Sequence, residues 1–209
     1  MVRATNQLKR KDDNINNQNN KLKFESIVAP SNNHYLNYRS VPKGKKQIIM
    51  AYHSKEYKSF KKELEPYLKQ IVEEHNWDIT PTATKHYYLD IVMYFDRTDK
   101  DPNNYFKTPC DVGNEIIYVD DRTIITRVTR VYYTYNEQVP PHFEYELYPV
   151  EYIGIFDSVD EYEEFVMKCK SCRNYKDGDC KRLAEYMFYK ITKDFDWENR
   201  ECLGYKEKK

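Results

Sequence analysis

The sequence predicts an α/β (α+β) protein, in which a mixed sheet is flanked by helices and a small helical module with four cysteines follows. Residues 87–95 (YYLDIVMYF) are rich in aromatic and β-branched side chains, which is typical of a buried strand. Residues 55–76 carry apolar side chains at the i, i+3, i+4, i+7 spacing of an amphipathic helix. The 209 residues suffice for one domain of about 120–150 residues with an appendage.

Composition divides the chain into three predicted segments. Residues 1–23 are polar, rich in Asn and Lys, and lack hydrophobic periodicity, so we expect a disordered tail; a phosphate-binding arm is the alternative. Residues 24–149 form the predicted main domain, because strand and helix patterns alternate there. Residues 150–209 form a cysteine-rich C-terminal extension.

The first half of the main domain is expected to contain one strand, one basic loop and one long helix. Residues 24–29 (FESIVA) are the predicted strand, and turn residues follow them. Lys43-Gly-Lys-Lys46 indicates a loop that could reach phosphates through its charges and its backbone N–H groups. Ser54 is the expected N-cap of the helix at residues 55–76, and Pro66 predicts a kink or a break within it.

The second half of the main domain continues the alternation. After the strand at residues 87–95, residues 103–118 are expected to be largely helical despite Pro109. Residues 123–135 (TIITRVTRVYYTY) indicate another strand, and residues 143–148 alternate as a further one.

Acidic residues flank the predicted helix at residues 103–118. Asp101, Asp111, Asp120 and Asp121 lie at the end of one strand, inside the helix and at the start of the next strand, an arrangement that can bring carboxylates to one point. Mg²⁺ takes hard oxygen ligands, and carboxylate-held Mg²⁺ assists phosphodiester hydrolysis. Lys107 could offset negative charge in the transition state. Aspartates are also common at turns and helix ends, so a purely structural role is the alternative.

Three blocks of sequence, in order, resemble the RusA family of Holliday-junction resolvases over residues 24–148. The entry block is Pro30-Ser-Asn-Asn-His-Tyr35, followed by the basic loop at Lys43–Lys46. The middle block matches the family's Asp-x-Asp-Asn-x-x-Lys motif on Asp101, Asn103, Asn104 and Lys107, with Asp111 four residues on. The last block is an aromatic residue and an Asp pair before a strand, here Tyr118, Asp120 and Asp121.

The resemblance implies a Mg²⁺-dependent endonuclease of phage or prophage origin that resolves four-way DNA junctions in recombination and repair. Symmetric paired incisions would require a homodimer. By resemblance, the catalytic residues are Asp101, Asn103, Lys107 and Asp121, and the metal ligands are Asp101, Asn103, Asp120 and Asp121. The implied DNA-binding residues are Asn33, Tyr35, Arg39, Lys43, Lys45, Lys46 and Lys107.

The chain departs from the family pattern at Asn103, where the family has an aspartate. An Asn carbonyl oxygen can ligate Mg²⁺ but brings no negative charge. A branched-DNA-binding protein with weakened catalysis is therefore the alternative function, and a structural protein with acidic turns is a third.

The C-terminal extension is expected to be mostly helical. Residues 152–156 indicate a short strand, and Ser158 with Glu161 forms a capping box that begins a helix reaching about residue 168. A second helix is expected at residues 181–193.

Four cysteines of the extension follow the spacing Cys169-x2-Cys172-x7-Cys180-x21-Cys202. The first pair has the spacing found in structural zinc sites, while the remaining spacings match no standard finger. A structural Zn²⁺ site, four unligated cysteines and an iron–sulfur cluster are the three interpretations. The extension could also dock a protein partner.

Charge and hydropathy patterns bear on location and partners. Formal net charge is zero, but residues 39–62 contain eight Lys or Arg and one acid, whereas residues 142–164 contain eight acids and no Lys or Arg. Such an uneven distribution can bind a polyanion on one face, although solvated surface is the simpler interpretation. No apolar run of about 18 residues and no leader pattern occurs, so we expect a cytoplasmic protein that does not bind membranes, with cysteines reduced or metal-bound.

Overall fold

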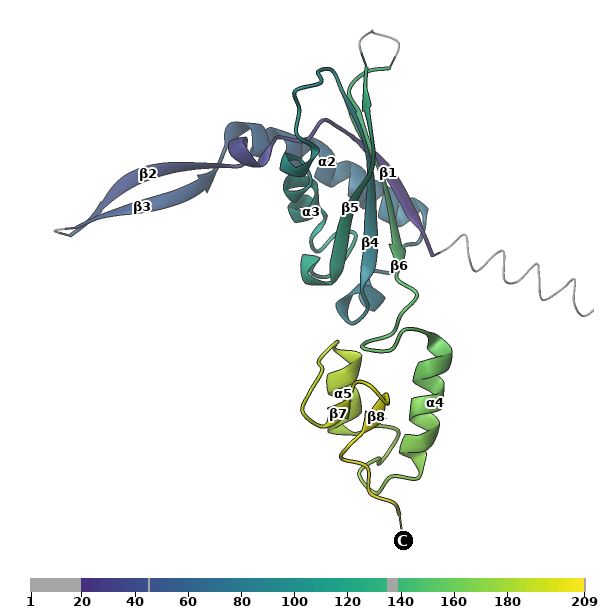
Figure 1. The fold of residues 1–209 in the computed structure, drawn as a ribbon. Coiled ribbons are helices and arrows are strands. Elements are labelled where there is room, and N and C mark those ends of the chain that lie inside the picture. Colours follow the sequence, from purple (N-terminus) through teal and green to yellow (C-terminus); the bar gives the residue numbers. More distant parts are fainter. Residues whose placement is uncertain (1–19, 45, 135–138, 209) are drawn as a thin grey trace, which may run out of the picture. The chain divides into compact units, whose positions relative to one another are not determined.

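The computed structural model describes residues 20–44, 46–134 and 139–208. They divide into two compact units, the first ending at Pro149 and the second beginning at Val150 (Figure 1). Helices and a mixed sheet are both present, so the predicted α/β class is confirmed. Across the described ranges, no helix has the length and apolar character that crossing a membrane requires.

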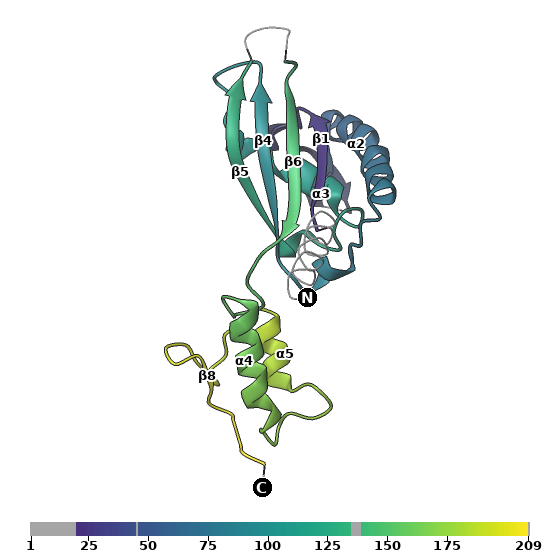
Figure 2. The ribbon, with the colours of Figure 1, turned by 90° about the vertical axis from the view of Figure 1, so that its right-hand side faces the viewer.

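The first unit is built on a four-stranded sheet with the order β1-β6-β4-β5 (Figure 2). Its strands are β1 (Leu22–Ile27), β6 (His142–Pro149), β4 (Tyr87–Phe95) and β5 (Ile124–Tyr133). Strands β4 and β5 are parallel, and the other neighbours are antiparallel, so the expected mixed sheet is confirmed. Leu22 and Lys23, which we placed in a disordered tail, belong to β1, while residues 1–19 lie outside the described chain.

One face of this sheet carries the core. In β4, Tyr87, Leu89, Ile91, Met93 and Phe95 are buried, which is the period-two alternation of a strand with one covered face. Helix α2 (Lys55–Glu74) and helix α3 (Lys107–Gly113) supply the other side of the same hydrophobic cluster. This packing fixes α3 against the sheet, close to the start of β5.

Helix α2 follows its predicted pattern. Ser54 is the N-cap, and its Oγ accepts a hydrogen bond of 3.0 Å from the backbone N–H of Tyr57. Of the kink or break expected at Pro66, the break is wrong, because one helix runs through that position. Pro66 is exposed, so water can satisfy the carbonyl oxygen that its missing N–H leaves without a donor.

A two-stranded hairpin projects from the first unit (Figure 1). Its strands, β2 (Leu36–Lys43) and β3 (Lys46–His53), were not expected, although the turn falls within the predicted basic loop. The strands pair from Leu36 with His53 to Lys43 with Lys46. Gly44 in the turn has φ of +63°, which a glycine adopts without strain. We call residues 36–53 the arm.

The predicted helix at residues 103–118 is much shorter in the structure. A 3₁₀ turn at Pro102–Asn104 precedes α3, which ends at Gly113. Glu115 has φ of +63°, a left-handed conformation that cannot continue an α-helix. The returning chain brings the Tyr118 hydroxyl to the carbonyl oxygen of Cys110, to which it donates a hydrogen bond of 2.6 Å. A second 3₁₀ turn, Asp121–Thr123, leads into β5.

The second unit has its own small core, formed by Ile155, Phe156, Phe165, Cys169, Leu183, Tyr186 and Phe195. Its elements are α4 (Val159–Lys170), α5 (Lys181–Met187), β7 (Phe195–Asp196) and β8 (Glu201–Cys202). One half of the predicted capping box is confirmed, because Ser158 Oγ accepts a hydrogen bond of 3.2 Å from the Glu161 N–H. The other half differs, because the Glu161 carboxylate accepts from the Asp157 N–H, at 2.6 Å, rather than from the Ser158 N–H. Two expectations are wrong: residues 152–156 form a turn closed by an Ile153–Phe156 bridge, and α5 ends before residue 193.

Candidate active site and nucleic-acid interface

An open pocket of about 270 Å³ lies beside α3 and the start of β5. It draws residues from the entry turn, from α3, from the turn before β5 and from β5 itself. Its lining is Asn32, Phe106, Lys107, Cys110, Asp111, Asp121, Ile124 and Thr126. Two carboxylates and one ammonium group therefore share one concave surface, and we call this the acidic pocket.

Asp111 is the fixed carboxylate of the acidic pocket. The Tyr35 hydroxyl donates a short hydrogen bond to Asp111 Oδ2, and Lys107 Nζ lies 3.3 Å from Asp111 Oδ1. Burial, and next the hydrogen bond to Asp111, raise the pKa of the Tyr35 phenol well above its ordinary value. A neutral phenol therefore holds the carboxylate, while the ammonium group one helical turn earlier balances its charge.

Asp121 is the second carboxylate, and it is less constrained. Burial raises the pKa of the Cys110 thiol to about 11, and the charges of Asp111 and Asp121 both add to this rise. The carboxylates of Asp111, in α3, and Asp121, in the turn before β5, therefore both lie close enough to the Cys110 thiol to affect its pKa. No other described residue makes a hydrogen bond or ion pair with the Asp121 carboxylate. It remains available to a ligand.

Asn32 contributes an unpaired oxygen to the acidic pocket. Its Nδ2 donates a hydrogen bond of 3.5 Å to the carbonyl oxygen of Asn103, but its buried Oδ1 has no partner among the described residues. A buried acceptor without a donor is uncommon in folded proteins and invites a water or a cation. With Asp111 and Asp121 it makes a set of hard oxygen atoms of the kind that Mg²⁺ prefers. The residues present therefore fit this metal.

The remaining residues of the metal set implied by resemblance lie outside the pocket lining. Asp101 caps the 3₁₀ turn before α3, and its oxygens accept hydrogen bonds of 3.0 Å from the Asn103 N–H and 3.1 Å from Asn104 Nδ2. Asp120 accepts two hydrogen bonds of 2.9 Å from Arg122, one from the N–H and one from Nε. Asn103 is exposed and reaches the pocket only through its carbonyl oxygen, at Asn32.

Of the residues that the resemblance assigned to catalysis or metal, the structure brings Asp121 and Lys107 together. Asp111, which the sequence marked as part of the motif, and Asn32, which it did not single out, complete the arrangement. Within the described ranges, no three His, Cys, Asp or Glu side chains already stand in ligating geometry.

The arm carries the implied DNA-binding residues, and its pairing divides them by face. Directly paired residues of an antiparallel ribbon point to the same face. Arg39, Lys43 and Lys46 therefore share one face, which we call the cationic face, with Asn37, Val41, Ile48, Met50 and Tyr52. The opposite, neutral face carries no Lys, Arg, Asp or Glu; it consists of Leu36, Tyr38, Ser40, Pro42, Gln47, Ile49, Ala51 and His53.

The other implied DNA-binding residues are placed differently. Asn33 is exposed in the entry turn, whereas Tyr35 turns inward to Asp111 and packs edge-on against His53 and Tyr57. Tyr35 thereby joins the base of the arm to α2 and α3. Lys45 lies outside the described residues.

No protein-family model matches the chain, and no curated protein is significantly similar to it. The RusA resemblance therefore stays a prediction that depends on the motifs and on the placement of their residues.

Removing the Tyr35 hydroxyl tests how firmly Asp111 is held. Tyr35→Phe is expected to lower the free energy of unfolding by about 1 kcal/mol, because a partly exposed hydrogen bond to a charged group is lost while the ring packing stays. Urea denaturation measures this change. Tyr38→Phe is the matched control, since the Tyr38 side chain is 67% exposed on the arm and should leave stability unchanged. Equal stability of all three proteins would contradict the expected role of Tyr35.

Proposed function

We propose that this protein is a metal-dependent endodeoxyribonuclease that cuts branched DNA, above all four-way junctions. The observation that carries the proposal is the acidic pocket. There, Asp121, Asp111 and Lys107 meet the unpaired oxygen of Asn32, although the entry turn lies far from α3 in the sequence. Metal-assisted phosphodiester hydrolysis uses hard anionic ligands for the metal ion, and a nearby cation stabilises the developing negative charge.

The residues of the pocket have separable roles in such a reaction. Mg²⁺ held there would supply a Lewis acid for a phosphate oxygen and a more acidic bound water. Asp121 and Asn32 offer oxygen ligands that the rest of the described chain does not occupy. Asp111, held by Tyr35, keeps the Lys107 ammonium group beside the site, where it offsets negative charge that develops on the phosphate.

The arm supports DNA as the substrate. A two-stranded ribbon fits the major groove of B-DNA, and Lys and Arg contacts to phosphates supply affinity independent of sequence. The cationic face presents Arg39, Lys43 and Lys46 on the same side of the ribbon. This arrangement suits a protein that recognises the shape of DNA by its phosphates rather than by its bases.

Symmetric paired incisions imply two active sites related by a two-fold axis, so the proposal includes a homodimer. Its setting is recombination and repair of phage or prophage DNA in the cytoplasm. The second unit would then be an appendage that could contact a protein partner.

Cleavage of a labelled four-way junction tests the proposal. The purified protein is incubated with the junction or with a linear duplex of matched sequence, in Mg²⁺ or in EDTA. We expect cleavage of the junction alone, and only in Mg²⁺. No cleavage of the junction, or equal cleavage of the junction and the linear duplex, would refute the proposal.

A branched-DNA-binding protein with weakened catalysis is the second candidate. It is favoured by Asn103 in place of an aspartate and by the lack of three ligating carboxylates, histidines or cysteines in the described part of the chain. It predicts junction binding without cleavage. Asn103→Asp would then restore cleavage if the missing charge is the defect.

Charge changes on the two faces of the arm test the DNA interface. Lys46→Gln removes one positive charge from the cationic face, and Gln47→Glu adds one negative charge to the neutral face, so both variants change net charge equally. Lys46→Gln is expected to reduce the slope of log affinity against log salt by about 1, because one phosphate contact is lost. Gln47→Glu should keep the slope, since its side chain points away from DNA. Equal slopes for the two variants would exclude the cationic face as the contact surface.

A further inference from the structure

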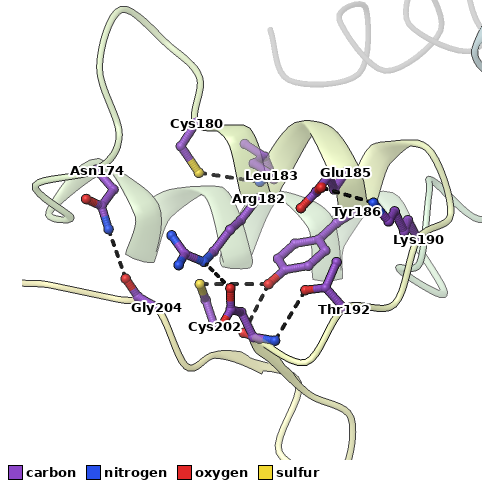
Figure 3. Close-up of polar contacts among 11 residues, drawn as sticks. Asn174, Cys180, Arg182, Leu183, Glu185, Tyr186, Lys190, Thr192, Cys202 and Gly204 are labelled. Carbon is purple, nitrogen blue, oxygen red and sulfur yellow. Dashed lines mark hydrogen bonds and ion pairs between the residues drawn. The ribbon is translucent and has the colours of Figure 1, made fainter.

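The second unit brings four cysteines from separate parts of its fold into one region. Cys169 lies in the last turn of α4, Cys172 in the turn after it, Cys180 at the N-cap of α5 and Cys202 in β8. All four are free thiols. Figure 3 shows Cys180 at the start of α5 and Cys202 beside the same helix.

Packing contacts show that the four cysteines are neighbours. Cys180 and Cys202 pack against the hydrophobic cluster that contains the buried Cys169, and the Cys172 N–H donates a hydrogen bond of 2.8 Å to the Cys169 carbonyl oxygen. Thiols gathered in this way resist ionisation, because each new negative charge repels the others. A bound cation reverses that effect, and a coordinating thiol then loses its proton.

Three of the four sulfur atoms accept hydrogen bonds from the fold. Cys172 Sγ accepts from the Lys206 N–H at 3.4 Å, and Cys180 Sγ accepts from the Leu183 N–H at 3.4 Å. The Tyr186 hydroxyl lies 3.9 Å from Cys202 Sγ (Figure 3). Hydrogen-bond donors that point at a sulfur atom stabilise its thiolate form and fix its orientation. Groups that hydrogen-bond to metal ligands have the same effect in known metal sites.

The cysteines lie on segments that already contact one another. Backbone hydrogen bonds connect the C-terminal end to the turn after α4, from Arg173 to Lys206 and from Lys208 to Ser171. The hydrophobic core of the unit is small, and short domains of this kind commonly need a disulfide or a structural metal. An open pocket lined by Cys169 and Cys202, with Lys168 and Glu201, gives a path from solvent to the sulfur atoms.

We propose that Cys169, Cys172, Cys180 and Cys202 bind one structural Zn²⁺ as a closed tetrathiolate site. The Cys-x2-Cys pair has the spacing of such sites, and thiolate ligands select Zn²⁺ over hard cations such as Mg²⁺. The four sulfur atoms are not yet in ligating geometry, so binding includes side-chain rotation that closes the cluster. With four protein ligands the site has no open position, and its role is to hold α4, α5 and the C-terminal end as one unit.

Metal content and cobalt substitution of the full-length protein test this site without DNA. We expect one zinc ion per chain after loosely bound metal is removed. Replacing zinc with Co²⁺ is expected to give the visible bands of a tetrahedral site and sulfur-to-cobalt charge-transfer absorption. Cys180→Ser and Cys202→Ser should lose the charge-transfer intensity and the stoichiometric zinc. Cys110→Ser, which alters the cysteine of the first unit, should retain both.

The result that would overturn the site is wild-type protein with no stoichiometric zinc and no cobalt–thiolate absorption. An iron–sulfur spectrum or a disulfide among these cysteines would overturn it equally.

A second measurement covers variants that fail to fold. Trp197 fluorescence reports unfolding of the second unit in a Trp77→Phe background, with and without a zinc chelator. The unfolding temperature of this unit should fall on chelation, and an unchanged temperature would count against zinc. Because neither measurement uses DNA or Mg²⁺, its outcome is independent of the proposed nuclease activity.

Discussion

Asp121→Asn is expected to slow junction cleavage by about 10²–10³-fold, which is the usual effect of removing one group that stabilises charge in a transition state. The Asp121 carboxylate lines the acidic pocket, and no other described residue forms a hydrogen bond or ion pair with it. Asn keeps the shape and one oxygen but removes the negative charge, so junction binding should be retained. Single-turnover cleavage in Mg²⁺ measures the rate separately from binding.

Asp120→Asn is the matched control, because it makes the same chemical change one residue earlier. The Asp120 carboxylate accepts both its hydrogen bonds from Arg122 and lies outside the pocket lining. Asn caps a turn as well as Asp does, so the fold should be unaffected. We expect Asp120→Asn to cut at nearly the wild-type rate. If both variants lost cleavage rate equally, the metal would be bound by the residues that the resemblance implies, which include Asp120 and Asp121, rather than in the acidic pocket.

Phe143→Ala is expected to lower the free energy of unfolding of the first unit by about 3–5 kcal/mol, the usual result of truncating a buried Phe. Phe143 is 0% exposed in β6, in the middle of the sheet. Its ring packs edge-on against Phe95 of β4 and against Tyr105, with centroids 5.4 and 6.0 Å away. The change leaves a cavity between the sheet and Tyr105, which lies in the segment that leads into α3.

The two tryptophans allow this effect to be assigned to one unit. Trp77 packs against the core of the first unit, and its Nε1 donates a hydrogen bond of 2.9 Å to the Ile117 carbonyl oxygen, whereas Trp197 belongs to the second unit. In a Trp197→Phe background, urea unfolding followed by fluorescence reports the first unit alone. Tyr38→Ala is the control, because its exposed ring should matter by no more than about 0.5 kcal/mol. Superimposable curves for Phe143→Ala and its parent would contradict the assigned core.

The sheet was predictable because its strands have one covered face. The bounds of β4 agree with the prediction at both ends, since aromatic and β-branched residues fill this segment and a turn-rich connection and a charged loop flank it. The arm was missed because neither of its faces is covered, so its strands show no alternation of apolar and polar residues. An unbroken apolar run, Ile48, Ile49 and Met50, is exposed on both faces of the ribbon. In addition, Gly44 lacks the Asn or Asp that commonly precedes glycine in a hairpin turn.

The candidate site was predictable in part. Lys107 and Asp121 came from the motif, and both line the acidic pocket. Asn32 could not be found from spacing, because its position depends on the entry turn packing against α3, where Thr108 donates a hydrogen bond of 3.3 Å to the Pro30 carbonyl oxygen. Asp101 was assigned to the metal by resemblance, but the local geometry of a 3₁₀ turn uses its carboxylate as a cap.

Incision mapping on a mobile four-way junction tests the central proposal most directly. Each of the four strands is 5′-labelled in turn, and the wild-type protein is added in Mg²⁺, in EDTA, or with a linear duplex in place of the junction. A dimeric junction nuclease should make paired, symmetric incisions in two opposed strands, and only in Mg²⁺. Junction binding with no incision in any strand at any Mg²⁺ concentration would contradict the nuclease proposal and favour the DNA-binding alternative.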